Sequence, residues 1–394
     1  MLDTIFTGMS GLMGYSKGLQ VIGNNLTNVN TPGFKGVNAE FGDMFAQQNQ
    51  QGAAGGGSTA GMGTGLDTLA TQINFQQGVL NQTGNPLDLA INGQGFFVLR
   101  EGSDITYSRA GQFTFDKDGF LINGANNGQR VAGFDKVGQL ADISLSSLQT
   151  NAAKASSSVK FTGNISSNAT TDVTLGGISI FDPAGGTHTL SLVFHQGTPN
   201  NWTVTATDET GTTVGTGSLQ FSNGNPVVTA NAIQLTYSPR GVSPFALSLD
   251  FSSNVTSSSN GNTSTIAIAS IDGNATGALT GATFDSTGTL VATYSNGATA
   301  KGQHLAIASF KSDQSISEVS GNQFVSKNPT DANYGQASTG MYGTISAGKI
   351  EGSNVDLSQE FSNLIVMQRG YQASSQVVST ANDMIQTLLD MKKQ

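Results

Sequence analysis

The sequence contains no cysteine and little charge, and each absence excludes a class of protein. With no cysteine among 394 residues, the chain forms no disulfides and offers no thiol nucleophile or thiolate metal ligand. Charged residues make up only 11% of it, and the net charge of −9 leaves no basic stripe of the kind that binds nucleic acid. The acidic residues are spread along the chain, which favours solubility.

Long apolar runs are also missing. No stretch approaches the roughly 20 apolar residues that span a bilayer. The first four residues, Met1–Thr4, lack the basic and apolar regions that open a secretory signal. We therefore expect no membrane insertion, and we expect that any export uses a route without a cleaved signal peptide.

Residues with catalytic or metal-binding chemistry are sparse and do not converge. His188, His195 and His304 share no metal-ligand spacing, and no nucleophile–base–acid arrangement stands out. The segment Asp116–Gly119 resembles the start of a calcium loop but lacks the later acidic ligand, so it predicts a hairpin turn. The single tryptophan, Trp202, is expected in a core. We expect no enzymatic activity, no metal and no cofactor.

Both ends of the chain carry a seven-residue apolar repeat, the pattern of a helix that packs along another helix. One helix is predicted from about Asp3, as its N-cap, to Asn28. A second, roughly 55 Å long, is predicted from about Asn354, as its N-cap, to Met391. We expect the two helices to pair as a coiled coil and to contact other copies of the chain. The predicted assembly seam consists of Ile5, Leu12, Leu19, Leu26, Leu357, Phe361, Leu364, Tyr371, Val378 and Ile385.

Glycine is unusually frequent in the first of these helices, at positions 8, 11, 14, 18 and 23. Because each glycine costs a helix about 0.8–1 kcal/mol relative to alanine, this segment is expected to be helical only when it is packed. The missing side chains would also let a neighbouring backbone approach closely.

Between the helices the sequence is rich in glycine, serine, threonine and asparagine, which is typical of short strands joined by tight polar turns. We therefore predict a mainly β protein with α-helical termini. A short buried strand is expected at Phe96–Leu99. The pattern T-F-D-x-x-G-x-L occurs at Thr114–Leu121 and again at Thr283–Leu290, and it predicts two hairpins of one domain that an insertion interrupts.

The insertion is predicted to form a β-sandwich or barrel-like domain. Its expected strands are Ile178–Phe181, Thr189–Phe194, Trp202–Thr207, Ile233–Tyr237, Phe245–Phe251 and Thr265–Ala269. The predicted organisation is a helical coiled-coil assembly domain at 1–28 and 354–394, a connecting segment at 29–70 with a flexible Gly/Gln-rich stretch at Gln47–Gly65, a discontinuous β-domain at 71–149 and 279–353, and an inserted outer β-domain at 150–278.

The residues that follow the first helix resemble the N-terminal signature of the bacterial flagellar rod/hook family. The matching run is Asn24 to Lys35, with Thr27 where the family usually has alanine, and its signature residues are Asn24, Asn25, Asn28, Asn30, Thr31, Gly33, Phe34 and Lys35. Ser108–Phe113 resembles a hairpin region of the family. Val355–Leu357, Gln368–Ala373 and Ser379–Met384 resemble its C-terminal helix. The resemblance covers roughly residues 1–148 and 280–394.

This resemblance implies a structural protein of the bacterial flagellum that polymerises outside the cell into a flexible helical tube and transmits motor torque to the filament. It implies export through the flagellar type III apparatus. The implied partners are other copies of the chain and the rod, hook-cap and hook–filament junction proteins. Length and the inserted domain favour a hook-type subunit. The Gln47–Gly65 stretch, where rod proteins often carry an insertion, leaves a distal rod-type subunit as the alternative.

A hypothesis of a different class is an extracellular β-rich adhesin or carbohydrate-acting protein. The sequence offers it little support, because it lacks paired acids and aromatic platforms. The heptad repeats at the two ends would also have no use in such a protein.

Overall fold

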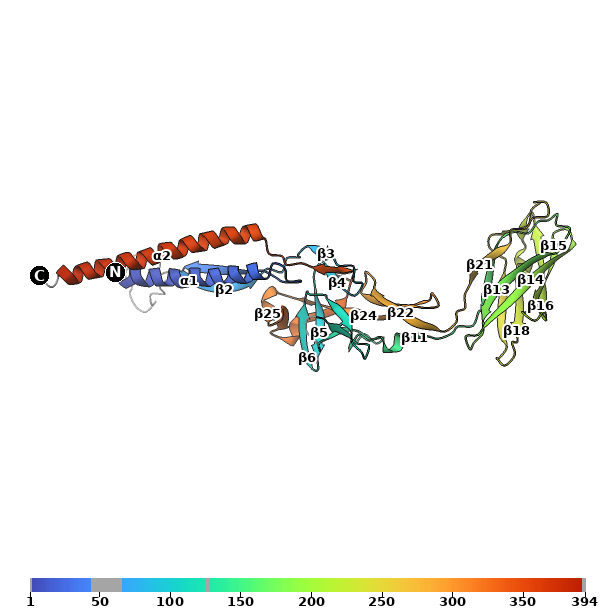
Figure 1. The fold of residues 1–394 in the computed structure, drawn as a ribbon, viewed down its shortest axis with the longest axis horizontal. Coiled ribbons are helices and arrows are strands. Elements are labelled where there is room, and N and C mark those ends of the chain that lie inside the picture. Colours follow the sequence, from blue (N-terminus) through green and yellow to red (C-terminus); the bar gives the residue numbers. More distant parts are fainter. Residues whose placement is uncertain (1, 44–65, 125–127, 392–394) are drawn as a thin grey trace, which may run out of the picture. The chain divides into compact units, whose positions relative to one another are not determined.

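The computed structural model describes residues 2–43, 66–124 and 128–391, and the Gln47–Gly65 stretch lies outside them. Helix α1 (Leu2–Thr27) and helix α2 (Leu357–Met391) lie side by side, and almost all of the regular structure between them is β (Figure 1). The prediction of a mainly β protein with paired terminal helices is confirmed. No helix of the described segments is long and apolar enough to cross a membrane.

The structure divides into two compact units. Unit 1 comprises Met1–Ser146, Thr283–Leu290 and Gly302–Gln394, and unit 2 comprises Ser147–Ala282 and Val291–Lys301. Both copies of the T-F-D-x-x-G-x-L pattern belong to unit 1.

Both predicted helix caps are wrong. Helix α1 begins at Leu2, so Asp3 lies within it and does not precede it. Helix α2 is capped by Asp356, whose Oδ1 accepts hydrogen bonds from the backbone N–H groups of Ser358 at 2.8 Å and Gln359 at 3.2 Å. Asn354 is not the cap, because its side chain hydrogen-bonds to other segments of unit 1.

A two-stranded antiparallel ribbon of β1 (Val37–Asp43) and β2 (Leu66–Ile73) packs against α1. The ring centroids of Tyr15 on α1 and Phe41 on β1 are 6.5 Å apart. An isolated two-stranded hairpin is marginal in water, so the ribbon and the glycine-rich helix depend on each other.

The β-domain of unit 1 is built on antiparallel strands around β5 (Phe96–Glu101). The order β9-β5-β6-β26-β25 runs across the sheet, and β24 pairs with β5, β9 and β27. Three small pairings complete the unit, β7 with β8, β4 with β28 and β3 with β29. The strands are β3 (Leu80–Gln82), β4 (Leu89–Asn92), β6 (Asp104–Ser108), β7 (Phe113–Phe115), β8 (Leu121–Asn123), β9 (Arg130–Phe134), β10 (Leu140–Asp142), β24 (Thr299–Phe310), β25 (Ile316–Val319), β26 (Gln323–Ser326), β27 (Ala332–Gln336), β28 (Thr344–Ala347) and β29 (Lys349–Glu351), with short 3-10 helices at Ser146–Leu148, Asp313–Ser315 and Pro329–Asp331.

Strand β5 has four consecutive buried residues, as the run Phe96–Leu99 predicts, because both of its faces are covered. On one face Phe96, Phe75 and Phe324 pack edge to face, with ring centroids 5.5–5.6 Å apart. On the other face Phe97 meets Phe113 at 5.0 Å. Aromatic packing on both sides therefore fixes this strand at the centre of the domain.

The two copies of the repeated pattern are hairpins, as predicted. In each, the Asp Oδ1 accepts the backbone N–H groups two and four residues later, for Asp116 as for Asp285. The glycine three residues after the aspartate has a positive φ, which only glycine adopts at little cost. The same turn recurs at Asp135, Asp182 and Asp208. Asp-x-x-Gly is thus a hairpin turn that recurs along this chain. The Asp116 carboxylate accepts backbone N–H groups of its own turn, as expected for a hairpin rather than a calcium loop.

Unit 2 is a sandwich of two five-stranded sheets. One sheet has the order β13-β14-β15-β16-β17, and the other has the order β18-β19-β12-β20 with β21 on β12. One hydrophobic core joins them, and Trp202 lies in it with 1% of its surface exposed, as expected. Its strands are β12 (Ser158–Asn164), β13 (Val173–Phe181), β14 (Thr187–Thr198), β15 (Asn201–Thr207), β16 (Thr213–Ser222), β17 (Asn225–Pro226), β18 (Ala232–Tyr237), β19 (Phe245–Asp250), β20 (Val255–Thr256) and β21 (Ala267–Ile271), with a 3-10 helix at Val228–Ala230. Strands β11 (Thr150–Asn151), β22 (Gly277–Phe284) and β23 (Thr289–Tyr294) belong instead to the larger sheet, in the order β11-β22-β23-β24.

The six strands expected in the insertion are present, although their ends differ by a few residues. Strands β12, β16, β17 and β20 were not expected. Strand β16 contains Gly215 and Gly217, which weaken a strand pattern in sequence. In the structure both glycines face apolar side chains of β18: a Cβ at Gly215 would lie 2.6 Å from Leu235, and one at Gly217 would lie 2.4 Å from Ile233.

Candidate assembly site

The two terminal helices run antiparallel and are in closest contact where α1 has glycine. A Cβ at Gly8 would lie 2.6 Å from Cγ2 of Val378, and a Cβ at Gly11 would lie 2.6 Å from Oγ of Ser374. Further along, a Cβ at Gly18 would lie 3.1 Å from Sδ of Met367. Glycines therefore let the two helices approach more closely than any other residue would permit, as their abundance in this helix predicts.

Some of the predicted seam residues lie along this contact. Ile5, Leu12, Leu19 and Leu26 on α1 and Leu364, Val378 and Ile385 on α2 are partly buried. Three others remain exposed, Leu357 at 43%, Phe361 at 52% and Tyr371 at 42%. Within one chain the seam is therefore only partly covered, and its role between subunits stays a prediction.

The heptad pattern missed the residues at the centre of the contact. These are Gly8, Gly11 and Gly18 on α1 and Met367, Gly370 and Ser374 on α2. The signal in the sequence was present, because positions 8, 11, 18, 22 and 25 follow helical spacing and are all buried. Three of these positions are glycine, which an apolar heptad pattern does not register, so a search for large apolar residues does not find this face.

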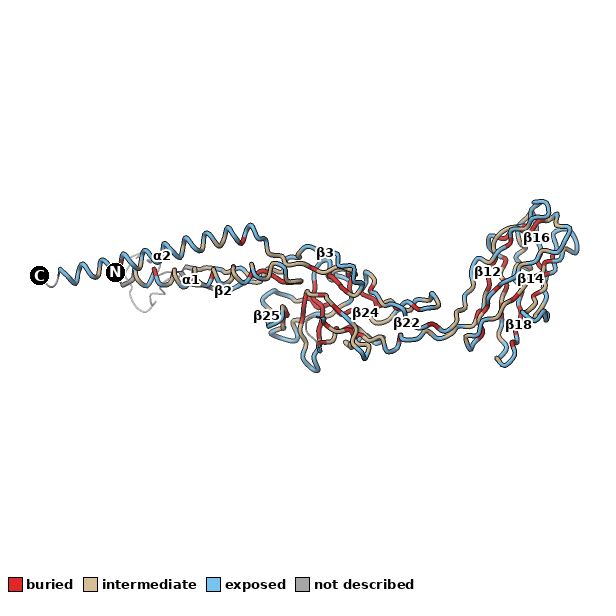
Figure 2. Tube along the Cα trace, in the orientation of Figure 1, coloured by how far each residue is buried: buried red, intermediate tan, exposed pale blue. Residues whose placement is uncertain are grey.

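Most residues of α2 are exposed (Figure 2). Large apolar side chains are among the exposed residues of both helices. On α1, Phe6 is 63% and Met13 is 72% exposed. On α2 the exposed set continues beyond the three seam residues named above, with Ile365, Val366, Val377, Met384, Leu388, Leu389 and Met391. So many exposed large apolar side chains on one helix pair indicate an interaction site.

The signature residues hold the end of α1 and the loop after it. The Asn25 side chain is buried, donates from Nδ2 to the backbone oxygen of Val37 at 2.8 Å and to Oε1 of Glu360 at 3.0 Å, and accepts the N–H of Val37 at 2.9 Å. It thereby ties the end of α1 to β1 and to the start of α2.

The remaining asparagines close the helix. Asn28 donates from Nδ2 to the backbone oxygen of Asn24 at 2.9 Å and accepts a hydrogen bond from Thr31 Oγ1 at 3.1 Å, while Asn30 is exposed. Side chains of this kind satisfy the carbonyls that a helix end leaves free.

The Thr31–Phe34 segment forms the expected turn. The Phe34 N–H donates to the Thr31 oxygen at 3.2 Å, and Gly33 has a φ of 71°, as position i+2 of a type II turn requires. A Cβ at Gly33 would lie 2.5 Å from the backbone nitrogen of Ala110. Phe34 is buried behind the turn. Gly33 is therefore required for both its conformation and its close contact with the β-domain.

Lys35, the last signature residue, belongs to a buried ion cluster with Glu351 and Arg109, here called the Glu351 cluster. Lys35 Nζ lies 2.6 Å from Glu351 Oε1, and Arg109 Nη1 lies 3.1 Å from Glu351 Oε2. The side chains of Lys35 and Glu351 are fully buried, and that of Arg109 is 4% exposed. Burial lowers the pKa of Lys35 and of Arg109, while the negative charge of Glu351 opposes both shifts. Sequence reasoning found Lys35 and the hairpin that carries Arg109 but not Glu351.

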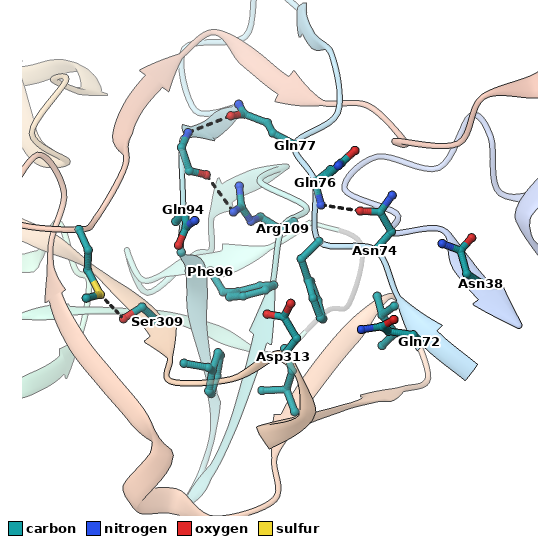
Figure 3. A pocket seen from close by; sticks show the side chains of 17 residues that line it. Asn38, Gln72, Asn74, Gln76, Gln77, Gln94, Phe96, Arg109, Ser309 and Asp313 are labelled. Atoms are coloured by element: carbon teal, nitrogen blue, oxygen red, sulfur yellow. Dashed lines mark hydrogen bonds between the residues drawn. The ribbon is translucent and has the colours of Figure 1, made fainter. Parts of the chain in front are cut away.

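Beside this cluster is a cavity of about 660 Å³, lined in similar measure by asparagine and glutamine side chains and by large apolar ones (Figure 3). Arg109 lies on its wall and donates from Nη2 to the Gly93 oxygen at 2.9 Å, and Gln77 Oε1 accepts the Gly93 N–H at 2.9 Å. Asp313 is the one acidic residue in the lining. Across the described segments, no group of three or more His, Cys, Asp or Glu residues is placed to hold a metal ion.

Three segments of the chain match models of known protein families. Residues 5–35 match the model "Flagella basal body rod protein", residues 90–167 match "Flagellar hook protein FlgE/F/G D1 domain", and residues 346–391 match "Flagellar basal body rod FlgEFG protein C-terminal". The paired helices and the β-domain between them thus define a rod- or hook-type axial protein of the bacterial flagellum.

Similar full-length proteins distinguish the hook type from the rod type. Flagellar hook protein FlgE of Escherichia coli (strain K12) is 31% identical over 417 aligned residues, which cover 98% of each chain. The FlgE protein of Borreliella burgdorferi is 28% identical and is aligned over the full length of both chains. The chain belongs to the flagellar hook protein family.

A solved structure supports the fold. The crystal structure of Helicobacter pylori flagellar hook protein FlgE2 is similar with a TM-score of 0.51 at 13% identity, over 67% of this chain and 98% of that one.

Proposed function

We propose that the chain is the structural subunit of a flagellar hook, and that it polymerises through α1 and α2 into a flexible tube that transmits torque from the motor to the filament. Full-length relatives named as hook proteins support this role. The proposal that α1 and α2 mediate polymerisation rests on the large apolar side chains exposed along both helices.

The energetics favour self-association through these helices. Burying one large apolar side chain contributes about 1.5–3 kcal/mol, and α2 alone exposes ten such residues, three of them in the predicted seam. A helix pair of this kind gains stability when it is enclosed by other copies. The tube wall is therefore proposed to contain α1, α2 and the seam residues, with the β-domains outside it.

The finer details of this role follow the family. We infer an extracellular hook in which the proposed partners are other copies of the chain, the rod, hook-cap and hook–filament junction proteins, and the type III export apparatus. The absence of cysteine agrees with export in an unfolded state, because no disulfide has to form on the way. The proposed role is structural and involves no catalysis.

A rod-type subunit is the second candidate. The matches to rod models at both ends support it. The alignment of hook proteins over 98% or more of the chain favours the hook. An adhesin or carbohydrate-acting protein has no such support.

The test is assembly of purified protein, followed by sedimentation and electron microscopy. Wild-type chain should form tubes. Tyr371→Asp should reduce the polymer yield at least about tenfold, because it removes an apolar contact and introduces a carboxylate at the same place in every subunit. The melting temperature of the β units in the monomer should not change, since Tyr371 is exposed there.

A matched control is Val228→Asp, which places the same charge at an apolar residue that is 85% exposed in unit 2. It should assemble normally. Normal yield from Tyr371→Asp, or equal loss in both variants, would refute assembly through α2.

A further inference from the structure

The segments that connect the helices and the β1–β2 ribbon to the β-domain of unit 1 meet at the Glu351 cluster. Lys35 lies in the segment that leaves α1, and Glu351 lies in the segment that enters α2. Gly78, which follows β2, donates its backbone N–H to Glu351 Oε1 at 2.8 Å. Arg109 belongs to the β-domain, where it also binds the Gly93 oxygen (Figure 3). One carboxylate therefore contacts three segments that are far from it and from one another in sequence.

Further hydrogen bonds hold the same segments together around the cluster. The Gly33 N–H donates to the backbone oxygen of Glu351 at 2.7 Å, and Lys35 Nζ donates to the Gln76 oxygen at 2.7 Å. Asn354 accepts the Gly36 N–H at 2.7 Å and donates to the Asn74 oxygen at 2.7 Å. The cluster is thus the centre of a continuous buried network.

The charges in this cluster are unequal. Two cations share one carboxylate, and both carboxylate oxygens are occupied. A buried ion group of this kind is weak evidence for stability, since apolar replacements are often as stable, but removing one partner leaves an uncompensated charge. Such a group does fix the relative orientation of the segments it joins, because charged hydrogen bonds have a specific geometry.

We propose that the Glu351 cluster is the joint that fixes the helix pair to the β-domain of unit 1 and passes torsional load between them, with Glu351 as the central positioning residue. This inference rests on the proposed role in a torque-transmitting tube. The joint holds three passages of the chain in one arrangement, so that rotation of the helices turns the β-domain with them.

The chain contains a natural control. Asp142 also pairs with two cations, Arg100 at 2.9 Å and Arg130 at 3.1 Å, but its side chain is 23% exposed, and those of the arginines are 31% and 40% exposed. All three residues lie on strands of the β-domain. This cluster has the same charges as the Glu351 cluster, but it is only partly buried and all its members come from the β-domain.

The first experiment measures hydrogen exchange of the Gly33, Gly36 and Gly78 amides in the full chain. Glu351→Gln should accelerate their exchange at least about tenfold, because it leaves Lys35 and Arg109 buried without a counter-charge. Lys35→Met should have a smaller effect, since it leaves the ion pair of Arg109 and Glu351, whose charges cancel. Asp142→Asn should leave these amides unchanged. Equal exchange in Glu351→Gln and wild type would overturn the proposal without any need for a polymer.

The second experiment separates a load-bearing joint from simple packing. The triple variant Lys35→Met, Arg109→Met, Glu351→Leu replaces the cluster by apolar side chains and should melt at the wild-type temperature. Its polymers, imaged by electron microscopy, should bend more easily than wild-type polymers. Polymers as stiff as wild type would overturn the joint and leave the hook function intact. A wild-type chain that forms no tubes would refute the proposed function, while the exchange result still decides whether the cluster fixes these segments.

Discussion

At the scale of single residues, the glycines of α1 are of two kinds: some are needed for the close contact with α2, and others are not. Gly8 and Gly23 both lie on α1 and both cost helix propensity. A Cβ at Gly8 would be 2.6 Å from Val378, but a Cβ at Gly23 would have no heavy atom within 4 Å. Val378 is β-branched and has few alternative rotamers, so it cannot move aside cheaply.

The prediction is that Gly8→Ala and Gly23→Ala have opposite effects. Gly23→Ala should stabilise the helix by about 1 kcal/mol. Gly8→Ala gains the same propensity but overpacks the contact with Val378, at a typical cost of about 1–3 kcal/mol. The critical concentration for polymerisation should therefore fall for Gly23→Ala and should not fall for Gly8→Ala. Equal stabilisation by both changes would show that the helices are not held this closely.

At the scale of elements, the junction between α1 and α2 contains a carboxyl group whose charge opposes packing. Glu360 is buried at the start of α2, and its Oε2 has no hydrogen-bond partner among the described residues. Burial raises the pKa of Glu360, and the hydrogen bond from Asn25 opposes this rise. Pairing of the helices therefore shifts Glu360 toward its protonated form.

The sign of the pH dependence follows from that shift. Because the folded pKa lies above the unfolded value of about 4.3, the paired state binds more protons in the window between the two, and its stability falls as the pH rises through that window. Glu360→Gln should remove this dependence and should stabilise the polymer near neutral pH, since an amide oxygen can still accept from Asn25. The measurement is the fraction of polymer that disassembles as a function of pH.

Asp383→Asn, which removes an exposed carboxylate from the same helix, is the control and should leave the disassembly profile unchanged. A profile that is the same in wild type and in Glu360→Gln would contradict the assignment.

At the scale of the whole molecule, the chain enters and leaves unit 2 through adjacent strands. Thr150 and Asn151 on β11 pair with Ala278 and Gly277 on β22. The core of unit 2 is formed by residues between Val159 and Ile271. The sandwich of unit 2 therefore has its own hydrophobic core, and the chain enters and leaves this sandwich through two neighbouring strands.

The prediction is that residues 152–276 can be excised and replaced by a short turn. The remaining chain should fold and assemble, because the helices and the β-domain of unit 1 are intact, but its tubes should differ in curvature. The excised segment, expressed alone, should unfold cooperatively on heating. Failure of both fragments to fold would show that the predicted domain boundaries at about 150 and 278 are misplaced.

The sequence by itself determined the features that depend on local patterns. The heptad repeats predicted both helices, alternating and apolar runs predicted β5 and six of the ten strands of the sandwich, and Asp-x-x-Gly predicted the hairpins at Asp116 and Asp285. These succeed because helix period, strand period and turn conformation are decided by neighbouring residues. The resemblance of the Asn24–Lys35 run likewise predicted the family.

Only the tertiary structure decided how distant segments meet. It placed glycines rather than leucines at the closest helix contact, and it moved the cap of α2 from Asn354 to Asp356, because Asn354 is engaged elsewhere. It also paired Lys35 with Glu351 across 316 positions of sequence. Glu351 carries no local signal of its role, since a glutamate in a short strand is normally solvated. Its function arises from burial and from the two cations that the fold brings to it.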